Sequence, residues 1–488
     1  MAAVYTTVAM RTRAKTGTAR TVFERFNRPV SMEAALVNFS RADRPALLES
    51  SLAKEGYEKF TILSADPVSV IEFDLVERVC PFSTLARHMA AYPSLPPSAN
   101  HDIFFPGGWI GYFTYESGLG MERIAVRKES GPALRGVRFG LYDTVAVYNH
   151  ATEEWWIAGV DWPDRFLRRA PVEQRFEAVR NRMIASQSPP PENPQPVLRG
   201  GETSVNMSPN SYMEKVRRIK RYIEAGDVYQ VNLSQRFEAR TAASPIDLYR
   251  ILRRKSPSAR AAFISWDDTA IMSASPELFL DLRCGHVLTR PIKGTRPRSD
   301  DPALDAHYRC ELVESEKDRA ELNMIVDLLR NDLGRACDYG SVRVVNANEI
   351  ETHPTVYHRV ATIEGTLRQE SDWVDLLRAS FPGGSVTGAP KIRAMQIISE
   401  LEPTPRGVYC GSIGWIGLDG SVSLNIAIRT MVQTGDVVRI HAGGAVVADS
   451  DPLGEYEEML AKAKAMLETV GYSAAAATLP IHQNFQPS

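Results

Sequence analysis

The sequence predicts an α+β protein in which large antiparallel or mixed β-sheets are flanked by helices. Three observations predict this class. Short segments rich in β-branched and aromatic residues often follow one another directly, helical spacing is confined to a few longer segments, and no repeat of about 20 to 50 residues is visible. A chain of 488 residues with 44% hydrophobic content can bury a large core, as one big domain or two closely packed halves.

The expected strands are runs of β-branched and aromatic residues bounded by glycine and other turn residues. In the first part of the chain they cover residues 107–113 and 144–148. In the second part they cover residues 228–237, 270–280, 406–416, 423–430 and 437–448. Because several of these strands are consecutive, a doubly wound parallel sheet is disfavoured.

Four helices are expected in the second part. The first begins at Ser208, a good N-cap followed by Pro209 in the first turn, and ends at Gly226. The others cover residues 311–333, 389–401 and 452–470, where apolar residues recur at helical spacing.

A proline-rich segment at residues 188–196 marks the clearest boundary, because so many prolines exclude both helix and central strand. We therefore divide the chain into a flexible leader (1–20), an N-terminal region (21–187), a proline-rich linker (188–207), a motif-rich C-terminal region (208–470) and a flexible tail (471–488). The leader is basic but lacks the continuous apolar core of a secretory signal.

Charge and cysteine content exclude several classes of function. The net charge of -2 balances 57 basic against 59 acidic residues, so no nucleic-acid or membrane partner is expected. No run approaches the roughly 18 apolar residues of a membrane span. The five cysteines are scattered, without a Cys-x-x-Cys pair, which predicts free thiols and a cytoplasmic location.

Two pairs of acids predict a site for a hard cation. Asp318 and Glu321 are three residues apart in one expected helix, and Glu455 and Glu458 are three apart in another, so each pair lies on one helical face. Two helices that present carboxylates to one point suit Mg²⁺, which keeps waters and takes one or two protein carboxylates. On spacing alone, solvated acids paired with nearby lysines explain the same pattern.

Residues 291–298, Pro-Ile-Lys-Gly-Thr-Arg-Pro-Arg, form a tight basic turn. Lys293 is a candidate nucleophile, Gly294 allows close approach of the backbone, and Thr295 offers a hydroxyl to a small anionic substrate. From these residues alone, a solvated basic loop is an equally good interpretation.

Recognition of a carboxylate is expected near the C-terminal end. Arg429 ends an apolar expected strand, where an unpaired charge would be costly, so a bound anion or a buried partner is predicted. Gly443 and Gly444 could offer backbone N–H groups to the same anion. Lys462, four residues after Glu458, would face the same side of its helix.

A general acid is also predicted. Glu277 lies between Pro276 and the apolar residues 278–280, where desolvation would raise its pKa. The glycine-rich residues 381–391, which include Gly388, run into a helix but lack the Gly-Lys-Ser/Thr of a phosphate loop, so we interpret them as a pocket wall and a helix cap.

Together these motifs resemble those of the chorismate-utilising enzymes, the anthranilate synthase component I family. The resemblance is strong over residues 208–466 and weaker over residues 45–160. It implies that family's chorismate-binding fold, with residues 21–187 similar to its N-terminal region and residues 208–470 similar to its catalytic region.

The resemblance also implies roles for single residues. Glu321 and Glu458 would be direct Mg²⁺ ligands, with Asp318 and Glu455 behind them. Glu277 would be the general acid. His358 matches an active-site histidine, with a catalytic and a structural role both left open. The residues that would contact chorismate are Thr295, Gly388, Tyr409, Arg429, Gly443, Gly444 and Lys462.

Two residues indicate which reaction of this family fits the sequence. Lys293 stands where relatives that make anthranilate typically carry alanine, and it points to the branch that converts chorismate and ammonia to aminodeoxychorismate for para-aminobenzoate and folate. Gln230 stands where relatives that add water carry a lysine base, and a neutral amide cannot take a proton from water at useful rates. No cysteine lies in a Gly-x-Cys-x-Gly elbow, so a separate glutamine amidotransferase subunit would supply the ammonia.

Two alternatives stay open. The chain could make anthranilate instead, or it could bind chorismate or tryptophan as a sensor without catalysis. Residues 46–50, Ala-Leu-Leu-Glu-Ser, resemble the family's tryptophan-pocket segment, although core packing of Leu47 and Leu48 explains them equally well.

Overall fold

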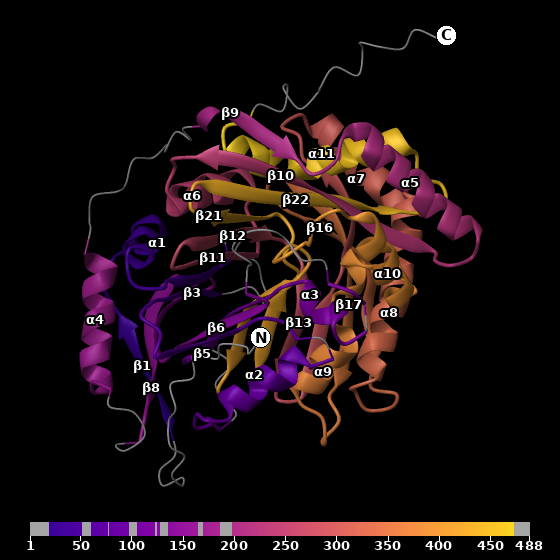
Figure 1. Cartoon of the computed structure of the whole chain (residues 1–488). Helices are drawn as coiled ribbons and strands as arrows, with labels where there is room; N and C mark the ends of the chain where they lie inside the picture. Colours follow the sequence, from indigo (N-terminus) through magenta and orange to yellow (C-terminus); the bar gives the residue numbers. More distant parts are fainter. Residues whose placement is uncertain are drawn as a thin grey trace, which may run out of the picture.

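A computed structural model of the chain shows two large β-sheets with helices packed around them (Figure 1). The structure describes residues 19–50, 60–76, 78–96, 105–122, 124–126, 135–163, 169–185 and 198–472. The expected leader and tail lie almost entirely outside these ranges. Within them, no helix is both long and apolar enough to cross a membrane. The α+β class with large antiparallel sheets is confirmed.

The larger sheet has twelve strands, and its pairings are antiparallel throughout the described residues. In spatial order they are β1 (Arg20–Phe26), β8 (Glu154–Asp161), β7 (Thr144–Asn149), β3 (Phe60–Ser64), β2 (Ala46–Glu49), β11 (Arg260–Trp266), β12 (Thr269–Ser275), β21 (Thr430–Thr434), β22 (Val437–Val446), β10 (Gln230–Thr241) and β18 (Gly388–Ala389), with β9 (Leu198–Val205) also paired to β10.

The smaller sheet has ten strands and is likewise antiparallel where it is described. Its order is β15 (Ile292–Pro297), β17 (Val356–Thr366), β14 (His286–Arg290), β13 (Leu278–Arg283), β20 (Val422–Asn425), β19 (Ser412–Gly417), β5 (Gly108–Phe113), β6 (Val137–Tyr142) and β4 (Ser69–Phe73), with β16 (Arg343–Thr352) paired to β17.

Each sheet contains strands from both the N-terminal and the C-terminal region. In the larger sheet Leu47 of β2 pairs with Phe263 of β11. In the smaller sheet Gly111 of β5 pairs with Gly414 of β19. The sheets therefore continue across the proline-rich segment of the sequence, and the core is shared by both regions.

Strand β5 shows how the core is divided. Trp109 and Phe113 belong to the larger cluster of buried hydrophobic residues, whereas Ile110 and Tyr112 belong to a second cluster. Alternate residues of a strand point to opposite faces, so β5 contributes to two cores at once. This explains why none of its six residues is exposed.

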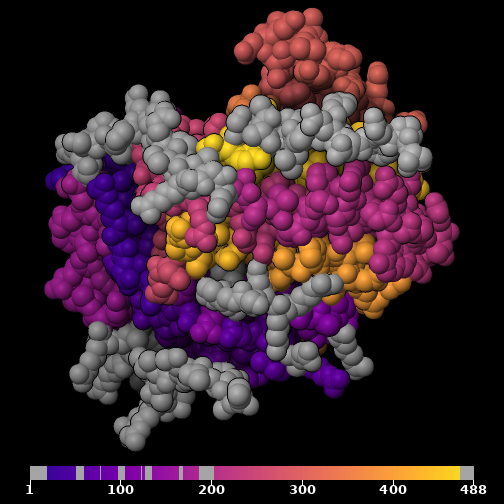
Figure 2. Space-filling model, turned by 45° about the horizontal axis from the view of Figure 1, so that its top comes forward, coloured from indigo at the N-terminus to yellow at the C-terminus, as the bar shows by residue number. Residues whose placement is uncertain are grey.

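Helices cover the outer faces of the sheets (Figure 1). They are α1 (Met32–Ser40), α2 (Pro81–Met89), α3 (Glu116–Leu119), α4 (Val172–Ile184), α5 (Pro209–Glu224), α6 (Pro245–Lys255), α7 (Pro302–Glu314), α8 (Glu316–Gly334), α9 (Trp373–Ser380), α10 (Lys391–Leu401) and α11 (Pro452–Thr469), with a 3₁₀ turn η1 (Gly384–Val386). Helices α5, α6 and α11 pack on the larger sheet, and α8 packs on β15 and β17 of the smaller one. Helix α7 is mostly exposed, and Figure 2 shows the part of the chain in its colour projecting from the body.

The local sequence sets where several helices begin. Ser208, Ser244, Asp301 and Asp451 cap α5, α6, α7 and α11, and each cap is followed directly by a proline. The capping side chain accepts an N–H that the helix leaves unpaired, and proline has no N–H to lose there.

Some elements differ from the expectation. Residues 311–333 were expected as one helix, but Ser315 ends α7 and caps α8 through its hydroxyl. Residues 270–280 form two strands, β12 and β13, separated by Pro276 and Glu277. Residues 406–411 form a loop before β19, and residues 198–205 of the expected linker form β9. Side-chain hydrogen bonds and edge pairing decide these details, and hydrophobic periodicity does not report them.

Candidate active site

Lys293 lies on β15, at the edge of the smaller sheet. The pairing of β15 with β17 shifts register between Ile292 and Thr295, and Gly294 has a φ of +79°, a conformation that favours glycine. A Cβ at Gly294 would also come within 2.9 Å of Cγ of Asp318. This irregular strand therefore carries the backbone of the Lys293 segment directly against helix α8.

The environment of Lys293 favours a neutral amine. Its Nζ donates to the main-chain oxygen of Ser385 at 3.3 Å. Burial lowers the pKa of Lys293, the carboxylate of Glu321 opposes that shift, and the neighbouring charge of Lys462 adds to it. A lysine held in this way has a larger neutral fraction than a solvated one, as a nucleophile requires.

Glu277 follows β12 and is only 4% exposed. Burial raises the pKa of its carboxyl to about 7, against the opposing effects of a hydrogen bond from the Ser385 side chain and of the charge on Lys293. The backbone N–H of Ile292 also donates to it. Glu277 can therefore hold a proton near neutral pH, as a general acid must.

The four acids come from helices α8 and α11, as their spacing predicts. A Cβ added at Gly444 on β22 would lie 3.0 Å from Oε2 of Glu455, 3.9 Å from Oε1 of Glu458 and 3.8 Å from Nζ of Lys462. These three side chains therefore gather over Gly444, and the absence of a side chain there leaves room for them. The N-terminal end of α8 brings Glu321 to the same region.

The charges of the two helices act on one another. Burial raises the pKa of Glu321; Lys293 and Lys317 oppose this shift, whereas Glu458 and Asp318 add to it. Burial also raises the pKa of Glu455. Partial burial acts in the same direction on Glu458, but the Lys462 ammonium, 2.7 Å from its Oε1, brings its pKa below the ordinary value.

We tested whether these acids suit Mg²⁺. Among the described residues, no three His, Cys, Asp or Glu side chains converge closely enough to hold a metal by themselves. Magnesium does not need such a cage, because it usually keeps waters and takes one or two carboxylates. Within the described part of the chain, Oε2 of Glu455 is buried and has no hydrogen-bond partner, while its Oε1 accepts from Ser450 at 2.6 Å. An all-oxygen set with one unpaired buried oxygen fits a hydrated hard cation, whereas Asp318 is paired with Arg296 at 3.1 Å.

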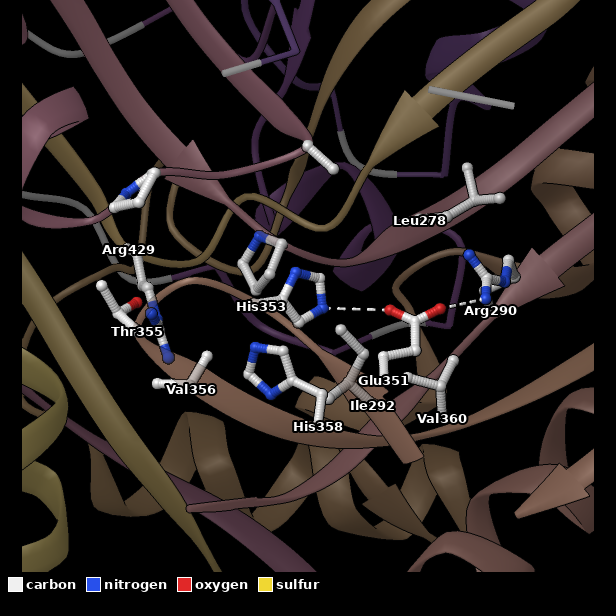
Figure 3. Close-up of a pocket in the computed structure, with 13 residues that line it drawn as sticks. Leu278, Arg290, Ile292, Glu351, His353, Thr355, Val356, His358, Val360 and Arg429 are labelled. Atoms are coloured by element: carbon white, nitrogen blue, oxygen red, sulfur yellow. Dashed lines mark hydrogen bonds and ion pairs between the residues drawn. The ribbon is translucent and has the colours of Figure 1, made fainter. Parts of the chain in front are cut away.

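His358 and Arg429 line a separate pocket (Figure 3). Ile292 and Leu278 also line it, whereas the adjacent Lys293 and Glu277 meet at Ser385. The candidate residues therefore form two groups, one that meets at Ser385 and one that lines this pocket.

Thr295 and His358 are joined within the second group. Their Oγ1 and Nδ1 atoms are 2.9 Å apart, and His358 is 3% exposed. Arg429 lies in the turn between β20 and β21 with a φ of +49°, and not at the end of a strand. Its NH1 donates to Ser256 at 3.4 Å, burial lowers its pKa, and no carboxylate within the described ranges pairs with it. A part-buried guanidinium with so few contacts is suited to an anion.

Tyr409 and two of the glycines lie in packed surroundings. The Tyr409 ring is stacked on His441, with 5.3 Å between ring centroids. A side chain at Gly388, whose φ is +149°, would overlap the main-chain oxygen of Gln230. One at Gly443 would overlap that of Leu233. Both glycines are thus required by close approach to β10.

Sequence reasoning missed several residues of this region. Ser385 contacts both Lys293 and Glu277, and only its place in a glycine-rich turn hinted at a role. In the pocket of Figure 3, His353 Nε2 lies 3.0 Å from Oε2 of Glu351, which also pairs with Arg290. No motif signalled this chain of three residues, because Arg290 lies on β14, distant in the sequence from Glu351 and His353, and meets them only in the fold.

Gln230 and Glu49 are polar residues with buried side chains. Gln230 is completely buried, and neither atom of its amide group has a hydrogen-bond partner in the described part of the chain. Glu49 of β2, within the segment 46–50, is buried and pairs with Arg253, while Tyr249 donates to it at 2.8 Å. Leu47 lies in the main core.

Comparison with known proteins places this arrangement in a family. Residues 44–468 match the family model described as chorismate binding enzyme. Aminodeoxychorismate synthase component 1 of Klebsiella aerogenes is 36% identical over 90% of this chain and 96% of its own length. Anthranilate synthase component 1 of Streptomyces coelicolor is 38% identical over 88% of this chain and 84% of its own length.

A solved structure shows the same fold. Anthranilate synthase component I from Streptococcus pneumoniae superposes with a TM-score of 0.72 at 30% identity, covering 90% of this chain and 99% of that one. The match of the family model over most of the chain, together with these relatives, shows that this protein belongs to the chorismate binding enzyme family.

Proposed function

We propose that this protein is the component I subunit of an aminodeoxychorismate synthase, which converts chorismate and ammonia to 4-amino-4-deoxychorismate for para-aminobenzoate and folate synthesis. The observation that carries the proposal is the placement of Lys293. Its side chain is partly buried, shares Ser385 with the acid Glu277, and lies near the carboxylates of α8 and α11. Several relatives named aminodeoxychorismate synthase component 1, at 35–38% identity, support the same assignment.

The first step uses Lys293 and Glu277 together. The neutral amine of Lys293 attacks ring carbon 2, both ring double bonds shift, and the hydroxyl on carbon 4 leaves as water with the proton of Glu277. The Lys293 nitrogen becomes a secondary amine on the substrate, and the proton that it loses restores the carboxyl of Glu277. Glu277 can supply the proton because burial raises its pKa to about 7.

The second step releases the enzyme. Ammonia adds at carbon 4, both ring double bonds shift back, and the Lys293 nitrogen leaves from carbon 2 as it takes up the proton that the ammonia nitrogen loses. The sum of the two steps is chorismate plus ammonia giving aminodeoxychorismate plus water, so atoms and electrons balance.

Glu321 and Glu458 would hold Mg²⁺, with Glu455 and Asp318 behind them. When bound, the ion supplies a positive charge that anchors the ring carboxylate of chorismate. Arg429 lies in the second group, so no carboxylate of a chorismate held at Lys293 is assigned to it. Its part-buried guanidinium, which pairs with no carboxylate in the described ranges, would bind an anion in the pocket of Figure 3.

Ammonia needs a source. The described cysteines are all free thiols, and none has the sequence context of a glutaminase nucleophile. We therefore propose that a separate glutamine amidotransferase subunit delivers ammonia to this chain, and that the pair works in the cytoplasm.

Anthranilate synthesis is the competing function, favoured by the 38% identity to anthranilate synthase component 1 of Streptomyces coelicolor. Lys293 argues against it, because enzymes that add ammonia at carbon 2 have no need of a nucleophile beside that carbon.

One assay separates these functions. The protein is incubated with chorismate, Mg²⁺ and an ammonium salt, and the products are separated before and after addition of the lyase that converts aminodeoxychorismate to para-aminobenzoate. We expect para-aminobenzoate only after the lyase is added. Anthranilate and pyruvate formed without the lyase would overturn the proposal.

A further inference from the structure

The main chain of η1 is aimed at the proposed nucleophile. Ser385, in the middle of η1, is 8% exposed, and its carbonyl oxygen accepts from Lys293 Nζ at 3.3 Å. Its side-chain hydroxyl donates to the carboxylate of Glu277. One residue thus contacts both groups that the proposed reaction requires, through two different atoms.

The carbonyl of Ser385 is held from a second side. The side-chain amide of Asn232 on β10 donates to it at 2.7 Å, and the backbone N–H of Asn232 donates to the oxygen of Thr387 at 2.8 Å. These two bonds tie the turn to strand β10 of the larger sheet. The direction of the carbonyl is therefore set by the fold and not by Lys293 alone.

Arg406 fixes the same turn and the same strand. Its guanidinium donates to the oxygen of Val386 at 2.9 Å and to that of Asn232 at 3.0 Å. The buried carboxylate of Glu402 neutralises it, with contacts at 2.7 and 2.8 Å. A planar guanidinium with fixed donors is suited to joining two main-chain segments in one geometry.

The support extends to the N-terminal region. Oε1 of Glu116 on α3 accepts the backbone N–H of Arg406 at 2.8 Å and that of Gly407 at 3.3 Å. The Arg406 guanidinium also lies 4.5 Å from the ring centroid of Tyr115. Ser385 therefore rests on residues from both regions of the chain.

We infer that Ser385 is a positioning residue for the reaction proposed above: its carbonyl takes one N–H of Lys293, so that the nitrogen lone pair is free to point at the substrate, and its hydroxyl fixes the carboxyl of Glu277 beside the leaving group. A neutral amine has two N–H groups and one lone pair, so fixing one N–H restricts where the lone pair can point. The inference rests on the proposed function.

The test removes the hydroxyl and keeps the carbonyl. Ser385→Ala should lower kcat about tenfold with little change in KM for chorismate, because a hydrogen bond to a catalytic carboxyl is lost. The hydroxyl lowers the pKa of Glu277, so its removal should also move the alkaline limb of the rate profile upward by about one pH unit. Ser385→Thr keeps a hydroxyl, so the alkaline limb of its rate profile should lie at the same pH as that of the parent.

The matched control is Ser380→Ala. Ser380 is also buried and loses a comparable bond, from its hydroxyl to the Leu376 oxygen at 2.5 Å, but its side chain does not contact Lys293 or Glu277. Ser380→Ala should have the same kcat as the parent and an alkaline limb at the same pH. Parent-like kcat and limb in Ser385→Ala would overturn the inference. The inference would also be overturned if Ser385→Ala and Ser385→Thr lose kcat equally and neither shifts the alkaline limb of the rate profile. Ser385 would then act only by packing.

A second readout needs no turnover. The melting temperatures of Ser385→Ala and of the double variant Glu277→Gln/Ser385→Ala are measured across pH. The difference between them should stop changing at a pH about one unit higher than the difference between the parent and Glu277→Gln does.

If the parent makes anthranilate, the proposed function is wrong. The limb is then measured on that product, since the hydroxyl on carbon 4 leaves in that reaction as well, and the inference about Ser385 is judged separately.

Discussion

Lys462 reaches Glu458 across one turn of α11, with 2.7 Å between Nζ and Oε1. The residue expected to bind substrate and the residue expected to bind Mg²⁺ thus neutralise each other. Lys317 lies in a similar way 4.0 Å from Glu321 on α8. Cations of the protein therefore compete for the carboxylates that a metal ion would use.

This competition predicts the behaviour of Lys462→Met. Loss of a half-exposed ion pair should tighten Mg²⁺ binding by up to about fivefold, because such pairs are worth up to about 1 kcal/mol. The KM for chorismate should rise, since a cation of the substrate site is lost. Calorimetric titration with Mg²⁺ measures the first effect, and steady-state kinetics the second. Unchanged Mg²⁺ affinity would separate Lys462 from the metal site.

Glu458→Gln should abolish Mg²⁺-dependent turnover while the fold remains intact. Its side chain is half exposed, so stability depends little on it, but an amide is a poor ligand for Mg²⁺, and activity should fall roughly 100-fold or more. Circular dichroism and a Mg²⁺ titration of activity check both parts. Glu457→Gln, on the exposed side of the same turn, is the control and should behave as the parent.

Lys293→Ala should stop formation of aminodeoxychorismate, because the nucleophile is removed while Glu277 and the acids remain. A slow release of the carbon 2 amino product that precedes anthranilate is then the route left open. In the parent protein without ammonia, a covalent adduct should accumulate on Lys293, detectable by intact-protein and peptide mass spectrometry. Parent-rate synthesis by the alanine variant, with no adduct in the parent, would leave Lys293 as a basic residue of the pocket wall. Lys464→Ala controls for loss of a lysine elsewhere.

The rate should depend on pH in a bell-shaped manner. Glu277 must hold its proton to donate it, so the rate falls as pH rises past about 7. Lys293 must be neutral to attack, so the rate also falls toward acid pH, and burial moves that limb to lower pH than for a solvated lysine. Glu277→Gln should lose the alkaline limb and about 10²- to 10⁴-fold in rate.

The same carboxyl should cost stability at neutral pH. Its pKa is about 7 in the folded protein against an ordinary value of 4.5, so folding becomes less favourable as pH rises between these values and levels off above about 7. Glu277→Gln removes this dependence and should be more stable than the parent at pH 8, by at most about 3 kcal/mol, but not at pH 4.5. Thermal melts of both proteins at the two pH values test it.

Lys391, at the start of α10, should matter for stability and not for substrate. Its Nζ pairs with the buried Asp332 at 2.6 Å and donates to the oxygen of Ser380 at 2.7 Å. Lys391→Met leaves that carboxylate buried alone and should cost about 3 kcal/mol or more. Adding Asp332→Asn should recover part of the loss in urea unfolding. If the single variant is as stable as the parent, the ion pair contributes nothing.

The sequence contained most of the secondary structure and part of the site. Helical spacing predicted that Asp318 with Glu321, and Glu455 with Glu458, share helical faces, and the structure brings both helices to one region. The burial of Glu277 between apolar neighbours was also readable, because strand composition reports burial.

Other relationships could not be read in this way. The bond from Arg406 to the Asn232 oxygen joins residues that are distant in the chain and meet only after both sheets have formed. The separation of His358 from Lys293 depends on the directions of the side chains on the paired strands β17 and β15, and the register shift in β15 changes that alternation between Ile292 and Thr295. Pattern reasoning has no access to a bulge, because a bulge changes the period on which the reasoning depends.

Strand β5 has a consequence for how the protein is made. Phe113 of β5 pairs with Ser412 of β19. Strand β5, which is synthesised early, therefore cannot complete its pairing until β19 has been synthesised. Until then β5 exposes an unpaired edge and two apolar faces on the nascent chain, and such edges attract other chains. The N-terminal region therefore cannot finish folding before β19 has been synthesised, and expression of residues 21–187 alone should give aggregates in place of a soluble domain.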